Sequence, residues 1–72
     1  MARKLADIEE GRVVRIVNVK CGNGEKRLLC EMGLAPGRAV EVLLKGSVVV
    51  VSVGGSKLCL SREVAEHVIV ED

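Results

Sequence analysis

The sequence contains no Phe, Tyr or Trp, and only one Pro among its 72 residues. Without aromatic rings the chain cannot build the stacking platforms that hold single-stranded nucleic acid, or the aromatic grooves that bind proline-rich peptides. Its formal net charge of +1 is also too balanced for phosphate neutralisation alone to carry nucleic-acid binding. We therefore expect no nucleic-acid partner and no proline-peptide binding of the eukaryotic signalling type.

Long apolar segments are missing as well. The longest uninterrupted apolar run covers residues 48–51, whereas a bilayer span needs about 20 residues. The basic start, residues 1–4, is not followed by the apolar segment of a secretory signal. The cysteines Cys21, Cys30 and Cys59 are odd in number and widely spaced, which disfavours a disulfide framework. These features predict a cytoplasmic protein with reduced thiols and no direct membrane insertion.

The short length limits the kinds of function that we expect. Residues 1–72, 49% of them hydrophobic, should form one small domain with a tight aliphatic core. Such a core leaves little room for a large active-site cavity. Nucleophilic catalysis also needs an activated Cys or Ser beside a base and an orienting group, and the sequence has a single His, His67. We therefore predict a binding module and not an enzyme, with no catalytic residues and no cofactor.

Short segments rich in Val, separated by glycine turns, predict a mainly β protein. One short helix is expected over residues 25–32, where the leucines have helical spacing, and helical turns are expected near 5–10 and 61–66. The expected strands cover residues 12–20, 38–45, 48–53, 56–60 and 68–70. About five strands of these lengths favour a small SH3-like β-barrel with one inserted helix.

The end of the expected helix carries the most specific local signal. Gly33 stands where a left-handed residue ends a helix, and Leu34 should then fold back onto Leu29 in a Schellman motif. Pro36 and Gly37 follow as the two central residues of a type II turn. Gly33, Leu34, Pro36 and Gly37 are therefore interpreted as a structural motif that stops the helix and turns the chain into the next strand.

Three smaller features add local predictions. Asn23 is well placed to cap the helix at its start. The imperfect alternation of the first strand predicts a bulge near Ile16–Val17. In the second strand, Val40, Val42 and Leu44 are expected to share one face.

The order of these signals resembles the FeoA family, the small cytoplasmic accessory proteins of bacterial ferrous-iron transport. The resemblance covers nearly the whole chain, and its most specific part is the stretch 32–37 with the leucine-containing helix before it. The residues that carry it are Leu5, Ile8, Gly11, Ile16, Arg27, Leu28, Met32, Gly33, Leu34, Pro36, Gly37, Val40, Val42, Leu58, Leu60, Ala65, Val68 and Val70.

The resemblance implies an SH3-like barrel with a helix inserted after the first strand. It also implies a role beside the membrane ferrous-iron transporter that carries a GTPase domain. Similar barrels occur as a domain of iron-dependent repressors. The family has no established catalytic residues to transfer to this sequence.

Two further features concern metal ligands and a basic patch. The candidate ligands Cys21, Cys30, Cys59 and His67 show no pair at the spacing of zinc ligands. We therefore predict no designed metal site. Most basic residues are interleaved with acidic ones, as on a solvated surface. A local patch formed by Lys20, Lys26 and Arg27 is an alternative contact for an acidic partner.

The run of four valines is the most informative irregularity. If Val49, Val51 and Val53 fill the core, the neighbouring valines of this strand must point away from it. Leu43, Val48, Val50 and Cys59, which fall on outward phases of adjacent strands, then form an apolar strand patch. Such patches usually mark interfaces. We expect it to bind a partner or a second copy of the chain, unless a helix or the N-terminal turn covers it.

These observations favour a non-enzymatic accessory protein that works by contact with the cytoplasmic part of a ferrous-iron transporter. Two alternatives stay open. One is a detached repressor-type barrel that acts on a metal-dependent transcription factor. The other is a weak Fe²⁺ or transition-metal-binding protein.

Overall fold

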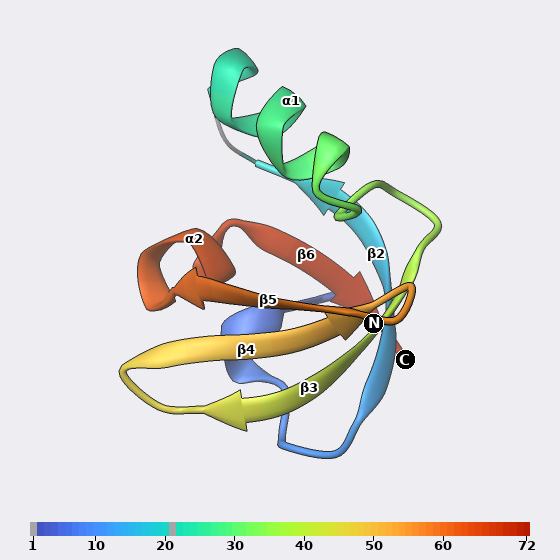
Figure 1. Cartoon of the computed structure of the whole chain (residues 1–72), viewed down its shortest axis with the longest axis vertical. Coiled ribbons are helices and arrows are strands. Elements are labelled where there is room, and N and C mark those ends of the chain that lie inside the picture. Colours follow the sequence, from blue (N-terminus) through green and yellow to red (C-terminus); the bar gives the residue numbers. More distant parts are fainter. Residues whose placement is uncertain (1, 21) are drawn as a thin grey trace.

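The computed structural model describes residues 2–20 and 22–72, apart from the side chains of 23, 25 and 26. Six antiparallel strands form one strongly curved sheet in the order β1-β6-β2-β3-β4-β5 (Figure 1). The elements follow the chain as β1 (Arg3–Lys4), η1 (Leu5–Asp7), β2 (Val13–Val19), α1 (Asn23–Glu31), β3 (Ala39–Lys45), β4 (Val48–Val53), β5 (Ser56–Ser61), α2 (Arg62–Glu66) and β6 (Val68–Glu71).

The expected elements are confirmed with small changes. The short strand β1, which pairs with β6, was not expected, and the first helical turn is limited to η1. The helix α1 begins at Asn23, and Gly22 occupies the N-cap position. The prediction that Asn23 caps this helix is therefore wrong, because Asn23 is already its first helical residue. The cap of α2 forms as expected, since the Ser61 hydroxyl accepts a hydrogen bond from the Val64 N–H at 3.1 Å.

Among the described residues, the core is made of aliphatic side chains alone. The residues of β4 alternate between half-buried and buried. Its inward-facing residues are the valines Val49, Val51 and Val53, which contribute aliphatic side chains to the core. The bulge predicted near Ile16–Val17 is confirmed by a register shift between Ile16 and Asn18 in the pairing of β2 with β6. The buried residues are Leu5, Ala6, Ile8, Val14, Ile16, Val19, Leu29, Leu34, Val40, Val42, Val49, Val51, Val53, Leu60, Ala65, Val68 and Val70.

The helix stop forms as the sequence predicts. The Leu34 N–H donates to the Leu29 carbonyl at 2.9 Å and the Gly33 N–H donates to the Cys30 carbonyl at 3.0 Å, which are the two bonds of a Schellman motif. Gly33 has a φ of +104°. The Arg38 N–H then bonds the Ala35 carbonyl at 3.1 Å across Pro36 and Gly37, whose φ of +92° is that of a type II turn. Local hydrogen bonds thus fix where α1 ends.

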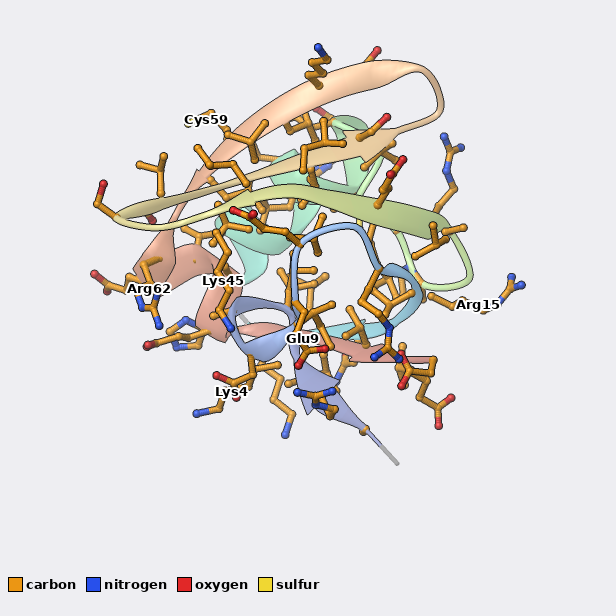
Figure 2. All side chains as sticks on the ribbon, turned by 90° about the horizontal axis from the view of Figure 1, so that it is seen from below. Lys4, Glu9, Arg15, Lys45, Cys59 and Arg62 are labelled. Carbon is orange, nitrogen blue, oxygen red and sulfur yellow. The ribbon has the colours of Figure 1, made fainter. Side chains whose placement is uncertain are left out.

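An ion cluster ties the N-terminal turn to the C-terminus. The Glu9 carboxylate lies 3.4 Å from Arg3 Nη2 and 3.3 Å from Arg12 Nη1, and Arg12 Nη2 lies 2.6 Å from Asp72 Oδ1. Glu9 is labelled in Figure 2, which shows it on the opposite side of the barrel from Cys59. The hydrogen bond from Arg3 is the main reason why the pKa of Glu9 falls below its ordinary value.

We expect Glu9→Gln to make stability less sensitive to acid. Because the folded-state pKa of Glu9 is lowered, its contribution is present above the unfolded-state pKa and is lost as the pH falls through the lowered value. The measurement is urea unfolding of both proteins from neutral to acidic pH. Wild type should be the more stable at neutral pH, and the difference should vanish in acid. A difference that grows in acid would contradict this assignment.

Candidate functional site

The structure brings the four residues of the strand patch onto three adjacent strands. Val50 lies directly opposite Cys59, and Val48 and Val50 share the outward face of β4. Leu43 and Cys59 are exposed, whereas Val48 and Val50 are half-buried by their neighbours. The patch therefore exposes less apolar area than four fully exposed side chains would. Whether it is an interface stays a prediction.

A bulge in β3 changes one expected face. The register of β3 against β4 shifts between Val42 and Leu44, so that Leu44 lies opposite Val50. Leu44 was expected to share the core face of Val40 and Val42, but it is 49% exposed, and that expectation is wrong. The extra residue of the bulge turns the next side chain outward. Leu44 therefore adjoins the strand patch, and nothing in the alternation of β3 signals this.

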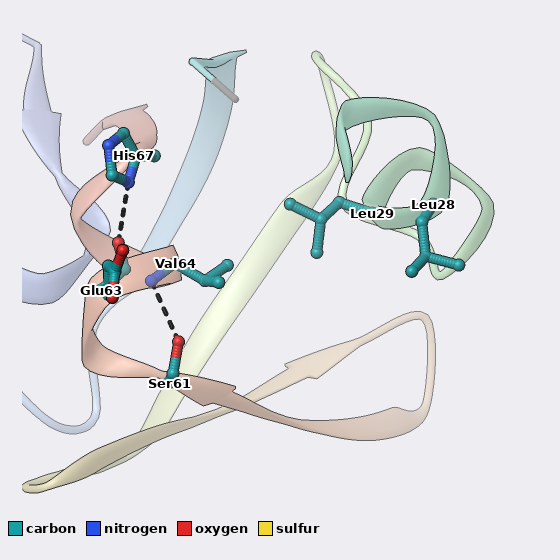
Figure 3. Close-up of a pocket in the computed structure, with 6 residues that line it drawn as sticks. All are labelled: Leu28, Leu29, Ser61, Glu63, Val64 and His67. Carbon is teal, nitrogen blue, oxygen red and sulfur yellow. Dashed lines mark hydrogen bonds between the residues drawn. The ribbon is translucent and has the colours of Figure 1, made fainter. Parts of the chain in front are cut away.

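The second candidate surface is a cleft between the two helices. It has a volume of about 310 Å³ and is lined by Leu28, Leu29, Ser61, Glu63, Val64 and His67. Figure 3 shows the leucines on the α1 side and Val64 on the α2 side. We call this feature the helix cleft. Its walls are aliphatic and its rim is polar, which is the composition of a binding surface.

The helix cleft exists because α1 stands away from the barrel (Figure 1). Leu29 is buried, but Leu28 beside it is 57% exposed and Met32 is 40% exposed. The three residues have helical spacing, so the apolar side of α1 is only partly covered by its own chain. The sequence predicted this helix and its leucines. It gave no signal that one of the leucines would remain accessible.

Two polar side chains on the rim, Ser61 and His67, form hydrogen bonds at the ends of α2. The Ser61 hydroxyl caps the helix start, and the His67 ring nitrogen Nδ1 lies 2.8 Å from the Glu63 carbonyl oxygen, to which it can donate. These contacts give Ser61 and His67 structural roles in positioning α2. The chemistry left to the helix cleft is apolar contact, with Glu63 available for a charged partner.

The other sequence candidates are dispersed. Cys30 is half-buried on α1 and Cys59 is exposed on β5, while Cys21 lies outside the described residues. Among the side chains that the structure describes, which leave out Cys21 and Glu25, no three from His, Cys, Asp or Glu converge as a metal site would require. The described helices also include none long and apolar enough to cross a membrane.

The proposed basic patch is only partly visible. Lys20 is exposed, and the Arg27 Nε lies 4.0 Å from the Glu31 carboxylate on its own helix. The side chain of Lys26 lies outside the described residues. The alternative of an acidic partner at this patch therefore stays a prediction.

The curved sheet, with α1 inserted between β2 and β3, defines a class of protein, a small SH3-like β-barrel with an inserted helix. A crystal structure of an iron uptake regulatory protein, FeoA, has the same fold with a TM-score of 0.90 and 29% sequence identity, over 99% of this chain and 97% of that one. The family model for the FeoA domain matches residues 3–72. The chain belongs to the FeoA family, as the sequence resemblance indicated, and this membership supports a role in ferrous-iron transport.

Two further solved structures have a similar fold. The crystal structure of Stenotrophomonas maltophilia FeoA complexed with zinc, described as a prokaryotic SH3 domain protein, matches with a TM-score of 0.82 and 24% identity over 96% of this chain and 89% of that one. The crystal structure of T. acidophilum IdeR matches with a TM-score of 0.87 and 18% identity, but this chain covers only 33% of it. No curated protein in the comparison matches the chain.

Proposed function

We propose that the chain is a non-enzymatic accessory protein of ferrous-iron transport that docks on the cytoplasmic part of the membrane transporter. Family membership supports the process, and the exposed apolar side of α1 supports docking. In this proposal the chain acts in the cytoplasm, where it meets that part of the transporter. Residues 1–72 act as one domain. It needs no nucleic-acid partner, no membrane insertion and no bound cofactor.

The observation that carries the proposal is the exposure of Leu28 at the mouth of the helix cleft. A leucine that is 57% exposed beside a 310 Å³ cleft leaves apolar surface in water that a partner can remove. Fully burying an exposed leucine contributes about 1.5–3 kcal/mol, so burying the exposed 57% of Leu28 contributes about 1–2 kcal/mol. An aliphatic segment of the transporter that enters the cleft would gain this energy against Leu28, Leu29 and Val64.

A rigid barrel could change the activity of the transporter by favouring one conformation of its GTPase domain. The barrel has a continuous aliphatic core, and α1, α2 and the end of β5 together line the helix cleft. Binding to one conformation of the GTPase domain more tightly than to another would shift its assembly or its nucleotide cycle. In this account any GTP chemistry belongs to the partner, and this chain only changes the populations of its states.

A panel of three variants tests the docking surface. We expect Leu28→Ser to weaken binding to the transporter's purified cytoplasmic GTPase domain by about tenfold or more, since that corresponds to about 1.4 kcal/mol of lost burial. Val13→Ser is the matched control, because Val13 is equally exposed at 59% but lies on β2. Val50→Lys probes the strand patch. Circular dichroism confirms that each variant is folded.

The proposal for the helix cleft predicts a loss with Leu28→Ser and none with Val13→Ser. Val50→Lys should also weaken binding if the strand patch contributes. Equal losses for Leu28→Ser and Val13→Ser, or a loss confined to Val50→Lys, would contradict the helix cleft as the docking surface.

The two alternatives have weaker support. The likeness to T. acidophilum IdeR at 18% identity concerns the fold alone, so it does not favour a repressor-type role. If that role held, loss of the chain would change expression of the transporter gene. A weak Fe²⁺-binding role is tested by anaerobic calorimetry with Fe²⁺, where our account expects no saturable heat.

A further inference from the structure

The strand β5 has a neighbour on one side only. It pairs along its whole length with β4, from Val53 opposite Ser56 to Val48 opposite Ser61. In the part of the chain that the structure describes, the sheet order ends at β5, so its other side is an open edge. An open edge presents backbone N–H and C=O groups that can pair with another extended segment.

The hairpin register shows which residues present these groups. Gly54 and Gly55 both have positive φ and form a two-residue turn, so the flanking pair Val53 and Ser56 exchanges hydrogen bonds. Bonded and non-bonded pairs then alternate along the strands. The backbone groups of Ser56, Leu58 and Leu60 face β4, and those of Lys57 and Cys59 face away from it.

The helix cleft continues this open edge. Ser61, the last residue of β5, lines the cleft together with residues of α1 and α2. In Figure 1, α1 lies together with α2 and β6 on the side of β5 that is opposite to β4. A segment that pairs with Lys57 and Cys59 and continues along the strand therefore reaches the aliphatic walls of the cleft. The backbone edge and the cleft form one elongated surface.

Charge complementarity indicates which kind of segment fits this surface. Lys57 is exposed and forms no ion pair with the residues that the structure describes. Opposite charges on neighbouring strands stabilise their pairing. The far end of the surface is apolar, with Leu28, Leu29 and Val64. The fitting occupant is an extended segment with an acidic residue at one end and aliphatic residues at the other.

We infer that β5 is the docking edge for such a segment, which adds to the sheet as a seventh strand and places its aliphatic end in the helix cleft. The inference rests on the proposed function, because the segment belongs to the cytoplasmic part of the transporter. Main-chain hydrogen bonds to Lys57 and Cys59 supply the pairing, and the cleft and Lys57 supply the selectivity.

Amide hydrogen exchange tests the edge directly. In the free chain the amides of Lys57 and Cys59 should exchange fast, while those of Leu58 and Leu60 should already be protected. On addition of the transporter's cytoplasmic GTPase domain, protection of Lys57 and Cys59 should rise by about tenfold or more. Leu58 and Leu60 serve as internal controls.

A pair of variants at one position separates the backbone from the side chain. Cys59→Pro removes the outward N–H at an edge position where proline is tolerated, and it should abolish the added protection at Lys57. Cys59→Ala keeps the N–H and should preserve it. If Cys59→Pro does not fold, the exchange measurement on the wild-type chain decides alone.

The outcomes distinguish this inference from the proposed function. Binding without new protection at Lys57 and Cys59 overturns the docking edge and leaves the proposed function standing. Protection that appears without the partner, in a concentration-dependent dimer, shows that a second copy occupies the edge and overturns the partner segment. Absence of any binding by the wild-type chain contradicts the proposed function and this inference together.

Discussion

Leu34→Ala should lower the free energy of unfolding by about 2–5 kcal/mol, the range for truncating a buried leucine. Leu34 is fully buried, and its N–H closes the Schellman motif on the Leu29 carbonyl at 2.9 Å. A domain of 72 residues has a total stability of only about 4–11 kcal/mol. The substitution therefore removes a large share of the stability and loosens the attachment of α1.

Denaturant unfolding followed by circular dichroism measures this effect. Leu44→Ala is the matched control, since Leu44 is 49% exposed and its truncation should change stability by about 0.5 kcal/mol or less. Similar losses in the two variants would show that Leu34 does not join α1 to the core as described.

Gly33→Ala should be more destabilising than Gly37→Ala. Both glycines have a positive φ, +104° and +92°, so an alanine at either position is strained by about 1–3 kcal/mol. The surroundings differ, because a Cβ on Gly33 would lie 3.2 Å from Cγ1 of the buried Val53, whereas a Cβ on Gly37 would meet nothing within 4 Å. The additional loss in the free energy of unfolding for Gly33→Ala measures the close approach of the end of α1 to β4.

The comparison of the two unfolding midpoints is the measurement. An equal loss in both variants would mean that backbone strain alone explains the glycines. The double variant Gly33→Ala with Val53→Ala is the control for the contact. Measured against Val53→Ala alone, Gly33→Ala should cost less than it does in the wild-type chain if Val53 is the residue that limits the space.

The sequence predicted the features of the fold that depend on neighbouring residues. The helix stop at Gly33 and Leu34 and the turn at Pro36 and Gly37 are set by backbone conformation and local hydrogen bonds. The core face of β4 follows from strand alternation. The same local stretch carried the most specific part of the resemblance to the FeoA family, and the family model matches the chain over residues 3–72.

The features that the sequence did not predict depend on tertiary contacts. The bulge that turns Leu44 outward is a property of the pairing of β3 with β4, and alternation within β3 alone predicts the opposite face. The exposure of Leu28 depends on how far α1 stands from the barrel, which the helical spacing of its leucines does not determine. The short strand β1 forms only because β6 offers it an edge.

The candidate site was therefore predicted only in part. The residues Leu43, Val48, Val50 and Cys59 do lie together on adjacent strands, but two of them are half-buried. The helix cleft adds a second apolar surface, with the open edge of β5 beside both. Binding measurements on Leu28→Ser, Val13→Ser and Val50→Lys identify which of these surfaces a partner covers.

The most direct test of the account measures binding of the wild-type chain to the purified cytoplasmic GTPase domain of its cognate ferrous-iron transporter. Calorimetry in the GTP-bound, GDP-bound and nucleotide-free states should show saturable binding in at least one state. GTP turnover by that domain should change when the chain is added, whereas the chain alone should hydrolyse no GTP. Failure to bind in every nucleotide state, with no change in turnover, would contradict the claim that this protein acts by docking.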